Sequence, residues 1–318
     1  MERINIVAIS IIIPTYNRGP YISRALNSII NQSFQDFEVI IVDGNSTDNG
    51  IEIIRSFDDS RIRLIQQNGK GVSAARNQGV KESQADLVAF LDADDEWMPL
   101  HLETVLQLRK RYPDAGLYTT AYKIFMNDGK IQWANYKYIP SPPWEGLLPN
   151  YFTSSALGDY PVWTSVVAIP KKIFNEVGGF PEGYWFGEDA DLFGKIAFKY
   201  PVAFSWEFGG IYHWDAGNRA CNKELFLDVE PFVRTARDAL NNCEVKPEFI
   251  EPLNEYIYQK EICRAEVNII AGNAMTARAI LKQCKPKWIY KMKIKWFILS
   301  FVPNRLLLYL MYFKLVSW

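Results

Sequence analysis

The sequence is poor in the residues that cross-link small proteins or bind zinc. It contains four cysteines and two histidines in 318 residues. The cysteines (Cys221, Cys243, Cys263 and Cys284) lie about twenty residues apart in the C-terminal third of the chain. None forms a CxxC pair or lies at metal-ligand spacing from a histidine. This pattern argues against a zinc site or a disulfide framework, and it fits a reducing compartment.

The chain also lacks an excess of either charge. Its 35 Lys and Arg residues and 36 Asp and Glu residues give a formal net charge of −1. That balance excludes a protein that coats nucleic acid through a general positive charge. The distribution is uneven, however, because residues 282–318 hold eight Lys and Arg and no Asp or Glu. This basic end predicts an anionic partner for that segment alone.

No apolar run reaches the roughly 20 residues that a membrane-spanning helix needs. The apolar segment at residues 4–13 has no small-residue cleavage site after it, so we interpret it as a first buried strand rather than a secretion signal and predict a cytoplasmic protein. Near the other end, residues 296–302 and 306–313 are apolar and are interrupted by Pro303 and Arg305. This basic, aromatic stretch is typical of a segment that lies in the headgroup region of an anionic membrane leaflet. The alternatives are a hairpin packed on the rest of the chain, a dimer interface and, least favoured, a nucleic-acid contact.

Short apolar runs alternate with helical patterns through the first 95 residues. This arrangement predicts βαβ units and a parallel sheet. The runs that read as buried strands are Ile9–Ile13, Phe37–Val42, Arg61–Ile65 and Ala85–Leu91. Further along we expect a helix at 99–112, a hairpin around 127–130, a surface loop over 140–160, a strand at 162–169, short helices at 171–177 and from Glu188 or Asp189 to Tyr200, and mostly helix over 222–284.

Polar residues gather directly after the predicted strands. They lie at residues 15–17, 43–48, 69–76 and 92–95. The carboxyl ends of parallel strands meet at one edge of a sheet, where open α/β sheets bind ligands. The segment Asp92-Ala93-Asp94-Asp95 has carboxylates suited to a hard divalent cation, although an acidic turn before a helix would look similar. An EF-hand, a dinucleotide-binding loop and a Walker loop all fail on their required residues.

Four of these segments together resemble family 2 glycosyltransferases. They are Ile11-Ile12-Ile13-Pro14-Thr15-Tyr16-Asn17, Val42-Asp43-Gly44-Asn45-Ser46-Thr47-Asp48, Ser73-Ala74-Ala75-Arg76-Asn77-Gln78-Gly79 and Phe90-Leu91-Asp92-Ala93-Asp94-Asp95. The resemblance resumes at residues 177–192 and is weak beyond about residue 215. The family implies the GT-A fold, a Rossmann-like mixed, mostly parallel sheet between helices, and a nucleotide-sugar donor bound with Mg²⁺ or Mn²⁺. Gly44-Asn45 departs from the turn that is commoner in the family.

The resemblance also implies roles for individual residues. Asp94 would be the metal ligand, and Asp92 would contact the ribose or the nucleotide side of the metal. Asp43 would accept an N–H of the base, and Arg76 would lie near the base and phosphates, where its guanidinium suits anionic oxygens. Arg76 has a plainer reading as a solvated helix residue. Pro14, Thr15 and Tyr16 would shape the nucleoside pocket, although Tyr16 also fits a packing role.

Glu188 and Asp189 form the second chemical element. By match with the family, Asp189 supplies the base that takes the proton of an acceptor hydroxyl. The alternative is that both carboxylates only complement a helix N-terminus. Trp185, Phe186 and Glu188 are candidates for the acceptor side, with either aromatic ring equally suited to the core. His213 is a candidate metal ligand, with a hydrogen-bonded structural histidine as the favoured alternative.

These observations predict a glycosyltransferase that moves a sugar, most simply from a UDP-sugar, to a hydroxyl of a glycan or lipid-linked glycan in cell-envelope or surface polysaccharide synthesis. The family resemblance implies inversion at the anomeric carbon. We expect a catalytic domain over 1–215, a helical extension over 216–284 and a membrane-associating tail over 285–318. The protein would attach peripherally to the cytoplasmic face of a membrane. The rival interpretations are a sugar-nucleotide pyrophosphorylase-like enzyme, which lacks its basic glycine-rich loop here, and a non-catalytic protein that has kept the fold.

Overall fold

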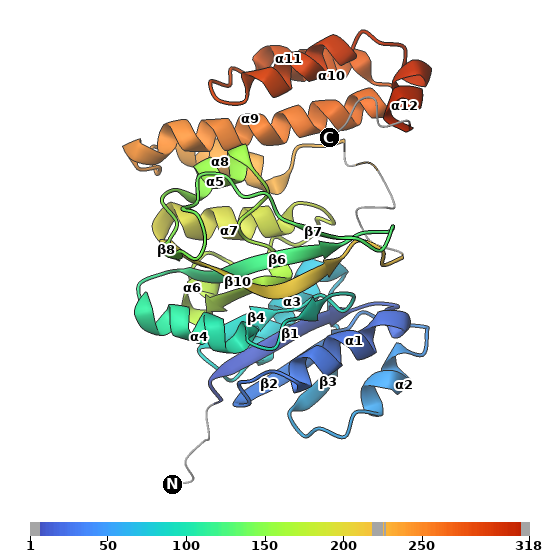
Figure 1. Ribbon diagram of the computed structural model, residues 1–318, viewed down its shortest axis with the longest axis vertical. Helices are drawn as coiled ribbons and strands as arrows, with labels where there is room; N and C mark the ends of the chain where they lie inside the picture. The colour runs from blue at the N-terminus through green and yellow to red at the C-terminus, as the bar shows by residue number, and fades with distance from the viewer. Residues whose placement is uncertain (1–6, 218–224, 226, 313–318) are drawn as a thin grey trace.

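The computed structural model describes residues 7–217, 225 and 227–312. At its centre lies a ten-stranded mixed sheet (Figure 1). Its main path runs β3-β2-β1-β4-β9-β6-β10-β5, while β7 pairs with β6 and β8 pairs with β10. The strands are β1 (Ile9–Thr15), β2 (Phe37–Asp43), β3 (Ile62–Gln66), β4 (Leu87–Phe90), β5 (Glu96–Trp97), β6 (Leu117–Phe125), β7 (Ile131–Trp133), β8 (Glu145–Leu147), β9 (Val167–Pro170) and β10 (Val202–His213).

The sheet confirms the predicted mixed, mostly parallel architecture. Strands β3, β2, β1 and β4 pair in parallel, and β6 pairs in parallel with β10. Strand β9 lies between β4 and β6 and is antiparallel to both. The six parallel strands therefore share one direction, so their carboxyl ends lie along a single edge of the sheet. We call this edge the carboxyl edge.

Helices cover both faces of the sheet (Figure 1). They are α1 (Gly19–Ile30), α2 (Gly50–Arg55), α3 (Gly71–Glu82), α4 (His101–Arg111), α5 (Tyr151–Leu157), α6 (Lys171–Glu176), α7 (Glu188–Lys199), α8 (Pro231–Asn241), α9 (Pro247–Ile270), α10 (Ala274–Gln283), α11 (Tyr290–Leu299) and α12 (Asn304–Tyr312). Helices α1, α2 and α4 contribute to one apolar cluster, and α3 with α5 to α9 contributes to the other. Two apolar faces explain why β1 and β2 are almost continuous runs of Ile and Val.

Three local predictions need correction. Residues 140–160 are not a surface loop, because they contain β8 and α5, and Tyr151 and Phe152 are buried. The strand expected at 162–169 begins as a 3₁₀ turn at Thr164–Val166 before β9. Strand β3 is only half-buried, because it lies at the edge of the sheet with β2 as its one neighbouring strand, whereas β2 has a strand on each side. The other predicted strands and helices are confirmed to within a few residues.

The C-terminal helices form two further layers. Helices α8 and α9 contribute Phe232, Leu253 and Tyr256 to the same apolar cluster as α5 and α7. Helices α10, α11 and α12 pack on the outer side of α9 around Ile262, Trp296 and Leu307. They lie at the opposite end of the long axis from β2 and β3 (Figure 1). Among the helices in the described part of the chain, none is long and apolar enough to cross a membrane.

A buried carboxyl lies on α9 beside the outer helices. Glu266 is 2% exposed, and its Oε1 has no hydrogen-bond partner within the described structure. Burial raises the pKa of Glu266 to about 8, and the charge of Lys295 offsets only part of that effect. The folded protein therefore keeps a proton on this group at pH values where the unfolded chain releases it.

This carboxyl makes stability fall as pH rises. Between its unfolded pKa, near 4.5, and about 8, the unfolded state binds fewer protons, so the free energy of unfolding declines by up to about 1.4 kcal/mol per pH unit. We expect Glu266→Gln, which cannot ionise, to flatten the decline and to be more stable than the wild type above pH 8. Denaturant unfolding at several pH values measures both curves, with the exposed Glu207→Gln as control. Parallel curves for the wild type and Glu266→Gln would contradict the assignment.

Candidate active site

The residues singled out in the sequence converge on the carboxyl edge. Thr15 ends β1, Asp43 ends β2, and the Asp92–Asp95 segment follows β4. Strand β10 also ends at this edge, at His213. Because β9 is antiparallel to β4, the start of β9 and the segment before it lie at the same edge. Helix α7 begins with Glu188 and Asp189. Arg76 contacts both Glu188 and Asp92, so the start of α7 lies beside the acidic segment. Segments more than 100 residues apart in the sequence thus form one acidic site.

The loops after β1 and β2 form one rigid wall of the site. Asp43 is buried, and its carboxylate accepts the backbone N–H groups of Asn45 and Ser46, both at 3.1 Å. The side-chain Oδ1 of Asn17 in turn accepts the N–H of Thr47 at 2.7 Å. Asn45 has a φ of 67°, a left-handed conformation that asparagine tolerates better than most residues. The unusual Gly44-Asn45 turn is therefore compatible with this geometry.

Arg76 joins the end of β4 to the start of α7. Its guanidinium is nearly inaccessible to solvent and contacts Asp92 Oδ1 at 2.7 Å and Glu188 Oε1 at 2.9 Å. Burial disfavours the charged form, but Asp92 and Glu188 outweigh it and raise the pKa of Arg76. The guanidinium also lies over the ring of Phe180, 5.0 Å from its centroid. Arg76 is thus a permanent cation fixed between two carboxylates, and it is not a solvated helix residue.

The other two carboxylates of the segment have different surroundings. Asp94 Oδ2 lies 3.4 Å from the guanidinium of Arg18. Asp95 is fully buried and accepts the hydroxyl of Ser165 at 2.7 Å and the N–H of His213 at 3.0 Å. Burial and the charges of Asp94 and Asp92 raise the pKa of Asp95 well above its usual range. Asp95 therefore holds three segments of the carboxyl edge together, while Asp94 is the less enclosed carboxylate of the two.

Helix α7 begins with a concentration of negative charge. Gly187 precedes it with a φ of 77°, which glycine adopts without strain. Glu188, Asp189 and Asp191 occupy the first turn, where the helix dipole stabilises carboxylates. Burial raises the pKa of Glu188, and the adjacent Asp189 raises it further against the opposing effect of Arg76. Asp189 is half-buried, and its Oδ1 accepts the N–H of Ala190 at 2.7 Å.

Residues of α8 and α9, in the C-terminal part of the chain, support α7 and the turn before it. Thr235 on α8 donates its hydroxyl to Asp191 at 2.6 Å. A Cβ on Gly194 would lie only 2.0 Å from the ring of Phe232, so the two helices touch where glycine leaves room. Lys260 on α9 is buried and contacts Glu230 at 2.8 Å, and the same Glu230 carboxylate lies against Gly187. These contacts fix the turn that carries Glu188 and Asp189.

The remaining candidates lie around the same edge. Tyr16 is 56% exposed, as expected for a side chain that faces a ligand or solvent rather than the core. The rings of Trp185 and Phe186 lie 5.9 Å apart just before α7, and Trp185 is partly exposed. His213 contacts Glu96 through Nε2 at 3.1 Å and Asp215 through Nδ1 at 3.2 Å. Both nitrogens of His213 thus have carboxylate partners in this structure.

Much of the sequence that forms this site matches a known protein family. Residues 10–162 match the family model described as glycosyl transferase family 2. The N-terminal half of the chain belongs to this family. The chain is 29% identical over 195 residues to the glycosyltransferase GlyG of Streptococcus pneumoniae, covering 58% of this chain and 63% of that protein. It is 32% identical over 191 residues to an uncharacterized glycosyltransferase of Haemophilus influenzae, covering 59% of this chain and 61% of that protein. In both comparisons the match spans less than two thirds of the relative.

Solved structures show the same fold. The Staphylococcus aureus TarS fragment 1–349 in complex with UDP-GlcNAc superposes with a TM-score of 0.67 at 18% identity, covering 87% of this chain and 82% of that one. The mannosyltransferase PcManGT from Pyrobaculum calidifontis, in complex with GDP-Man and Mn²⁺, gives a TM-score of 0.56 at 17% identity and covers 94% and 87% of the two chains. The GT-A fold of the family 2 glycosyltransferases is therefore confirmed, together with the helical C-terminal region.

The carboxylates of this family 2 domain fit a divalent cation that takes most of its coordinating oxygens from a bound substrate. The described residues contain no group of three or more His, Cys, Asp and Glu side chains arranged around one metal position. A cation bound through one or two carboxylates plus substrate phosphates needs no such cage. Asp94 suits that mode as a carboxylate just after the end of β4, and a metal ion there would take the place of the Arg18 guanidinium, which lies 3.4 Å from Asp94 Oδ2. Asp92 lies two residues away and is 28% exposed despite its contact with Arg76.

Sequence reasoning missed several residues that build this candidate site. Ser165 connects Asp95 to the backbone N–H of Asp92, and Glu96 contacts His213. Glu230 and Lys260 support Gly187 from the C-terminal helices. Glu96 directly follows the acidic segment and was open to detection. The others are single residues far from any motif, and no local pattern distinguishes them.

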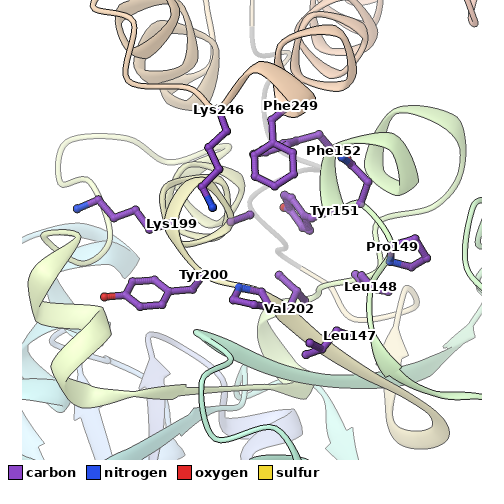
Figure 2. Close-up of a pocket in the computed structure, with 13 residues that line it drawn as sticks. Leu147, Leu148, Pro149, Tyr151, Phe152, Lys199, Tyr200, Val202, Lys246 and Phe249 are labelled. Atoms are coloured by element: carbon purple, nitrogen blue, oxygen red, sulfur yellow. The ribbon is translucent and has the colours of Figure 1, made fainter.

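A separate cavity lies away from the family 2 carboxylates. It has a volume of about 220 Å³ and lies between α5, the end of α7 and the start of α9 (Figure 2). Val202 lines it at the start of β10, whereas His213 ends the same strand about 36 Å further along. Its lining is mostly apolar and aromatic, as at Phe249. It also includes the cationic Lys199 and Lys246, and it includes no carboxylate. Its size is below the usual range for a ligand pocket, so the acidic edge remains the candidate active site.

Replacing Arg76 tests its bridging role. Arg76→Lys keeps one positive charge but cannot donate to Asp92 and Glu188 in the same planar geometry. One buried carboxylate then loses its partner, and we expect the free energy of unfolding to fall by about 3 kcal/mol. The matched change Arg234→Lys, at the exposed pair with Asp228, should cost less than about 0.5 kcal/mol. Denaturant unfolding measures both, and equal effects of the two variants would refute the bridge.

Proposed function

We propose that this protein is a metal-dependent glycosyltransferase that moves a sugar from a nucleotide-sugar to an acceptor hydroxyl, with inversion at the anomeric carbon. The observation that carries the proposal is the junction formed by Asp92, Arg76 and Glu188. It places the acidic segment after β4 beside the first turn of α7, where Asp189 lies. A donor-binding element and a candidate base therefore share one site. Family membership and the enzyme names of the relatives support this activity.

The loops after β1 and β2 form the nucleoside side of the site in this proposal. Pro14, Thr15 and Tyr16 border it on one strand, and Asp43 closes it on the next. The turn hydrogen bonds of Asp43 fix its carboxylate, so any N–H of a base meets an acceptor that is already in place. We infer a UDP-linked donor, supported by the UDP-GlcNAc bound to TarS; the GDP-Man bound to PcManGT marks the alternative base.

Asp94, with Asp92 beside it, would hold a Mg²⁺ or Mn²⁺ ion together with the donor diphosphate. Such an ion neutralises the charge that develops on a nucleoside diphosphate leaving group. The structure of PcManGT with Mn²⁺ supports a divalent ion in this fold. His213 is retained as a further candidate ligand, and it would have to leave Glu96 to serve as one.

Asp189 would accept the proton of the acceptor hydroxyl. As that oxygen bonds to the anomeric carbon, the bond from this carbon to the phosphate oxygen breaks and the nucleoside diphosphate leaves with the electron pair. Attack from the side opposite the leaving group inverts the centre. The hydrogen bond from the backbone N–H of Ala190 orients one carboxylate oxygen of Asp189, and the carboxylate of the neighbouring Glu188 is engaged by Arg76. Trp185 and Phe186 offer ring faces to the acceptor sugar.

We infer that the acceptor is a glycan or a lipid-linked glycan, in cell-envelope or surface polysaccharide synthesis at the cytoplasmic face of a membrane. The basic C-terminal helices support this location. In the same proposal, residues 1–215 form the catalytic domain, 216–284 an extension that supports α7, and 285–318 a tail that meets the membrane; residues 313–318 lie outside the described part of the chain.

The metal assignment predicts the behaviour of Asp94→Asn. Removing one carboxylate charge should abolish the Mn²⁺ dependence of nucleotide binding while the fold stays intact, because Asp94 contributes little to the apolar core. Calorimetry with whichever of UDP and GDP the wild type binds, with and without Mn²⁺, measures the effect. Asp128→Asn, at the exposed hairpin turn, is the control. An unchanged Mn²⁺ requirement in Asp94→Asn would remove this residue from the metal site.

The base assignment predicts the behaviour of Asp189→Asn. The asparagine keeps the size and shape of the side chain but cannot take a proton, so transfer should fall by about 10² to 10⁴-fold. Nucleotide affinity should stay near that of the wild type, because the donor-side residues are unchanged. The free energy of unfolding should change by about 1 kcal/mol or less, because asparagine also suits a helix start.

A matched control separates catalysis from helix stabilisation. Glu103→Gln removes a carboxylate from the first turn of α4, away from the site, and should leave transfer unchanged. Turnover assays on both variants with a panel of nucleotide-sugars measure the difference. Near-normal turnover in Asp189→Asn would rule out the proposed base, and Asp191 and Glu188 would be tested next.

A further inference from the structure

The outer surface of α11 carries an apolar stripe. Tyr290, Ile294, Ile298 and Phe301 follow one another at intervals of four, four and three residues, which places them on one side of the helix and the turn after it. Each is exposed, from 47% for Tyr290 to 65% for Phe301. The opposite side of α11 packs inward through Trp296, which is 3% exposed against α9. Helix α11 is therefore apolar on both sides, and only the inner side is covered within the described chain.

Helix α12 extends the same kind of surface. Leu306, Leu308 and Tyr309 are exposed, while Leu307 between them is fully buried in the cluster with α9. Eight of the twenty exposed large apolar side chains of the described residues fall within 288–309. We call the exposed residues of α11, α12 and the adjoining Trp288 the outer surface; its members are Trp288, Tyr290, Ile294, Ile298, Phe301, Leu306, Leu308 and Tyr309.

The segment that carries the outer surface has charges of one sign, although two carboxylates of α9 lie at its start, where Glu251 pairs with Lys287 and Glu255 accepts the backbone N–H of Trp288. Residues 282–312 contain six lysines and Arg305 and no Asp or Glu. Lys285 and Lys291 are exposed, and the ammonium of Lys295 lies 5.0 Å from the ring centroid of Trp296. Lysine side chains beside apolar residues can keep their stems in an apolar layer and their charges in water. The surface thus combines apolar anchors with a cationic border.

We propose that the outer surface binds the surface of an anionic lipid bilayer, with α11 and α12 lying along the membrane plane. Aliphatic and aromatic side chains on one helix face enter the boundary between headgroups and acyl chains, tyrosine and tryptophan favour that boundary, and lysines are attracted to anionic headgroups. A second copy of the chain fits less well, because two cationic borders would meet. Nucleic acid fits less well too, because only four of the eight members are aromatic, and the Ile and Leu members offer bases no stacking faces.

Two of the interpretations that the sequence left open for this segment do not exclude each other. Packing on the rest of the protein and contact with a membrane use different sides of α11 and are compatible. Through α9, this surface is connected to Lys260, Glu230 and the turn before α7. Binding would thereby hold the active site at a fixed orientation above the bilayer, which deepens the proposed function and rests on it for the delivery of a lipid-linked acceptor.

Vesicle binding tests the surface in the full-length protein. The wild type should sediment with vesicles of phosphatidylcholine mixed with phosphatidylglycerol and much less with phosphatidylcholine alone. The double variant Ile298→Ser/Phe301→Ser should bind at least about tenfold more weakly, because two apolar anchors are lost. Lys285→Gln/Lys291→Gln should weaken binding by roughly fivefold per lysine and reduce its salt dependence. The control Ile250→Ser/Met275→Ser removes two exposed apolar residues of α9 and α10 outside the surface and should bind as the wild type does.

Two further measurements make each outcome decisive. Unfolding and transfer to a water-soluble acceptor should be unchanged in Ile298→Ser/Phe301→Ser, so a loss of vesicle binding is not a loss of folding. Failure of the wild type to bind anionic vesicles, or equal binding by this variant, would overturn the proposal. A wild-type dimer that the variant dissociates in sedimentation equilibrium would assign the surface to self-association instead. Vesicle binding, unfolding and sedimentation do not depend on Asp189, so the proposed activity stands or falls separately.

Discussion

Carboxylates crowd the junction between β4 and α7, and the guanidinium of Arg76 is what allows them to remain there. Asp92 and Glu188 both contact it, and Asp189 adds its charge nearby. Without an enclosed cation, a charged carboxylate at so buried a position would take up a proton or move to solvent. The acidic edge and the first turn of α7 therefore depend on the same ion pairs. Under the proposed function, the donor side and the acceptor side of the site would share one electrostatic support.

The C-terminal helices complete that support from the far side of α7. The hydroxyl of Thr235, the ring of Phe232 and the buried pair of Lys260 with Glu230 fix the position of the helix along its length. Phe232 and Tyr256 also belong to the apolar cluster that covers the sheet. The family match ends at residue 162, yet Lys260 pairs with Glu230, which lies against Gly187 in the turn before the candidate base.

Local patterns predicted the parts of this fold that local physics decides. Runs of Ile and Val predicted β1 and β2, and the glycine-to-acid transition predicted the start of α7. The direction of β9 was not predictable, since a short apolar strand reads the same whether its neighbours are parallel or antiparallel. Helix α5 was missed because proline, tryptophan and glycine before it are typical of loops. In the site, motif residues were placed correctly at the edge, but the contact of Arg76 with Glu188 joins positions 112 residues apart, and no local pattern contains it.

The two apolar clusters that cover the faces of the sheet also have a consequence for biosynthesis. The cluster beneath α1, α2 and α4 is built almost wholly from residues 9–118, so most of it has left the ribosome early. The cluster beneath α7 needs Phe152, Phe232 and Tyr256 together, and it cannot close before the first half of α9 has been synthesised. Domains of multi-part chains fold as their segments emerge. The nascent chain thus holds a sheet that is covered on one face while the residues around Asp189 still await their support, and the candidate active site is complete only in the last third of translation.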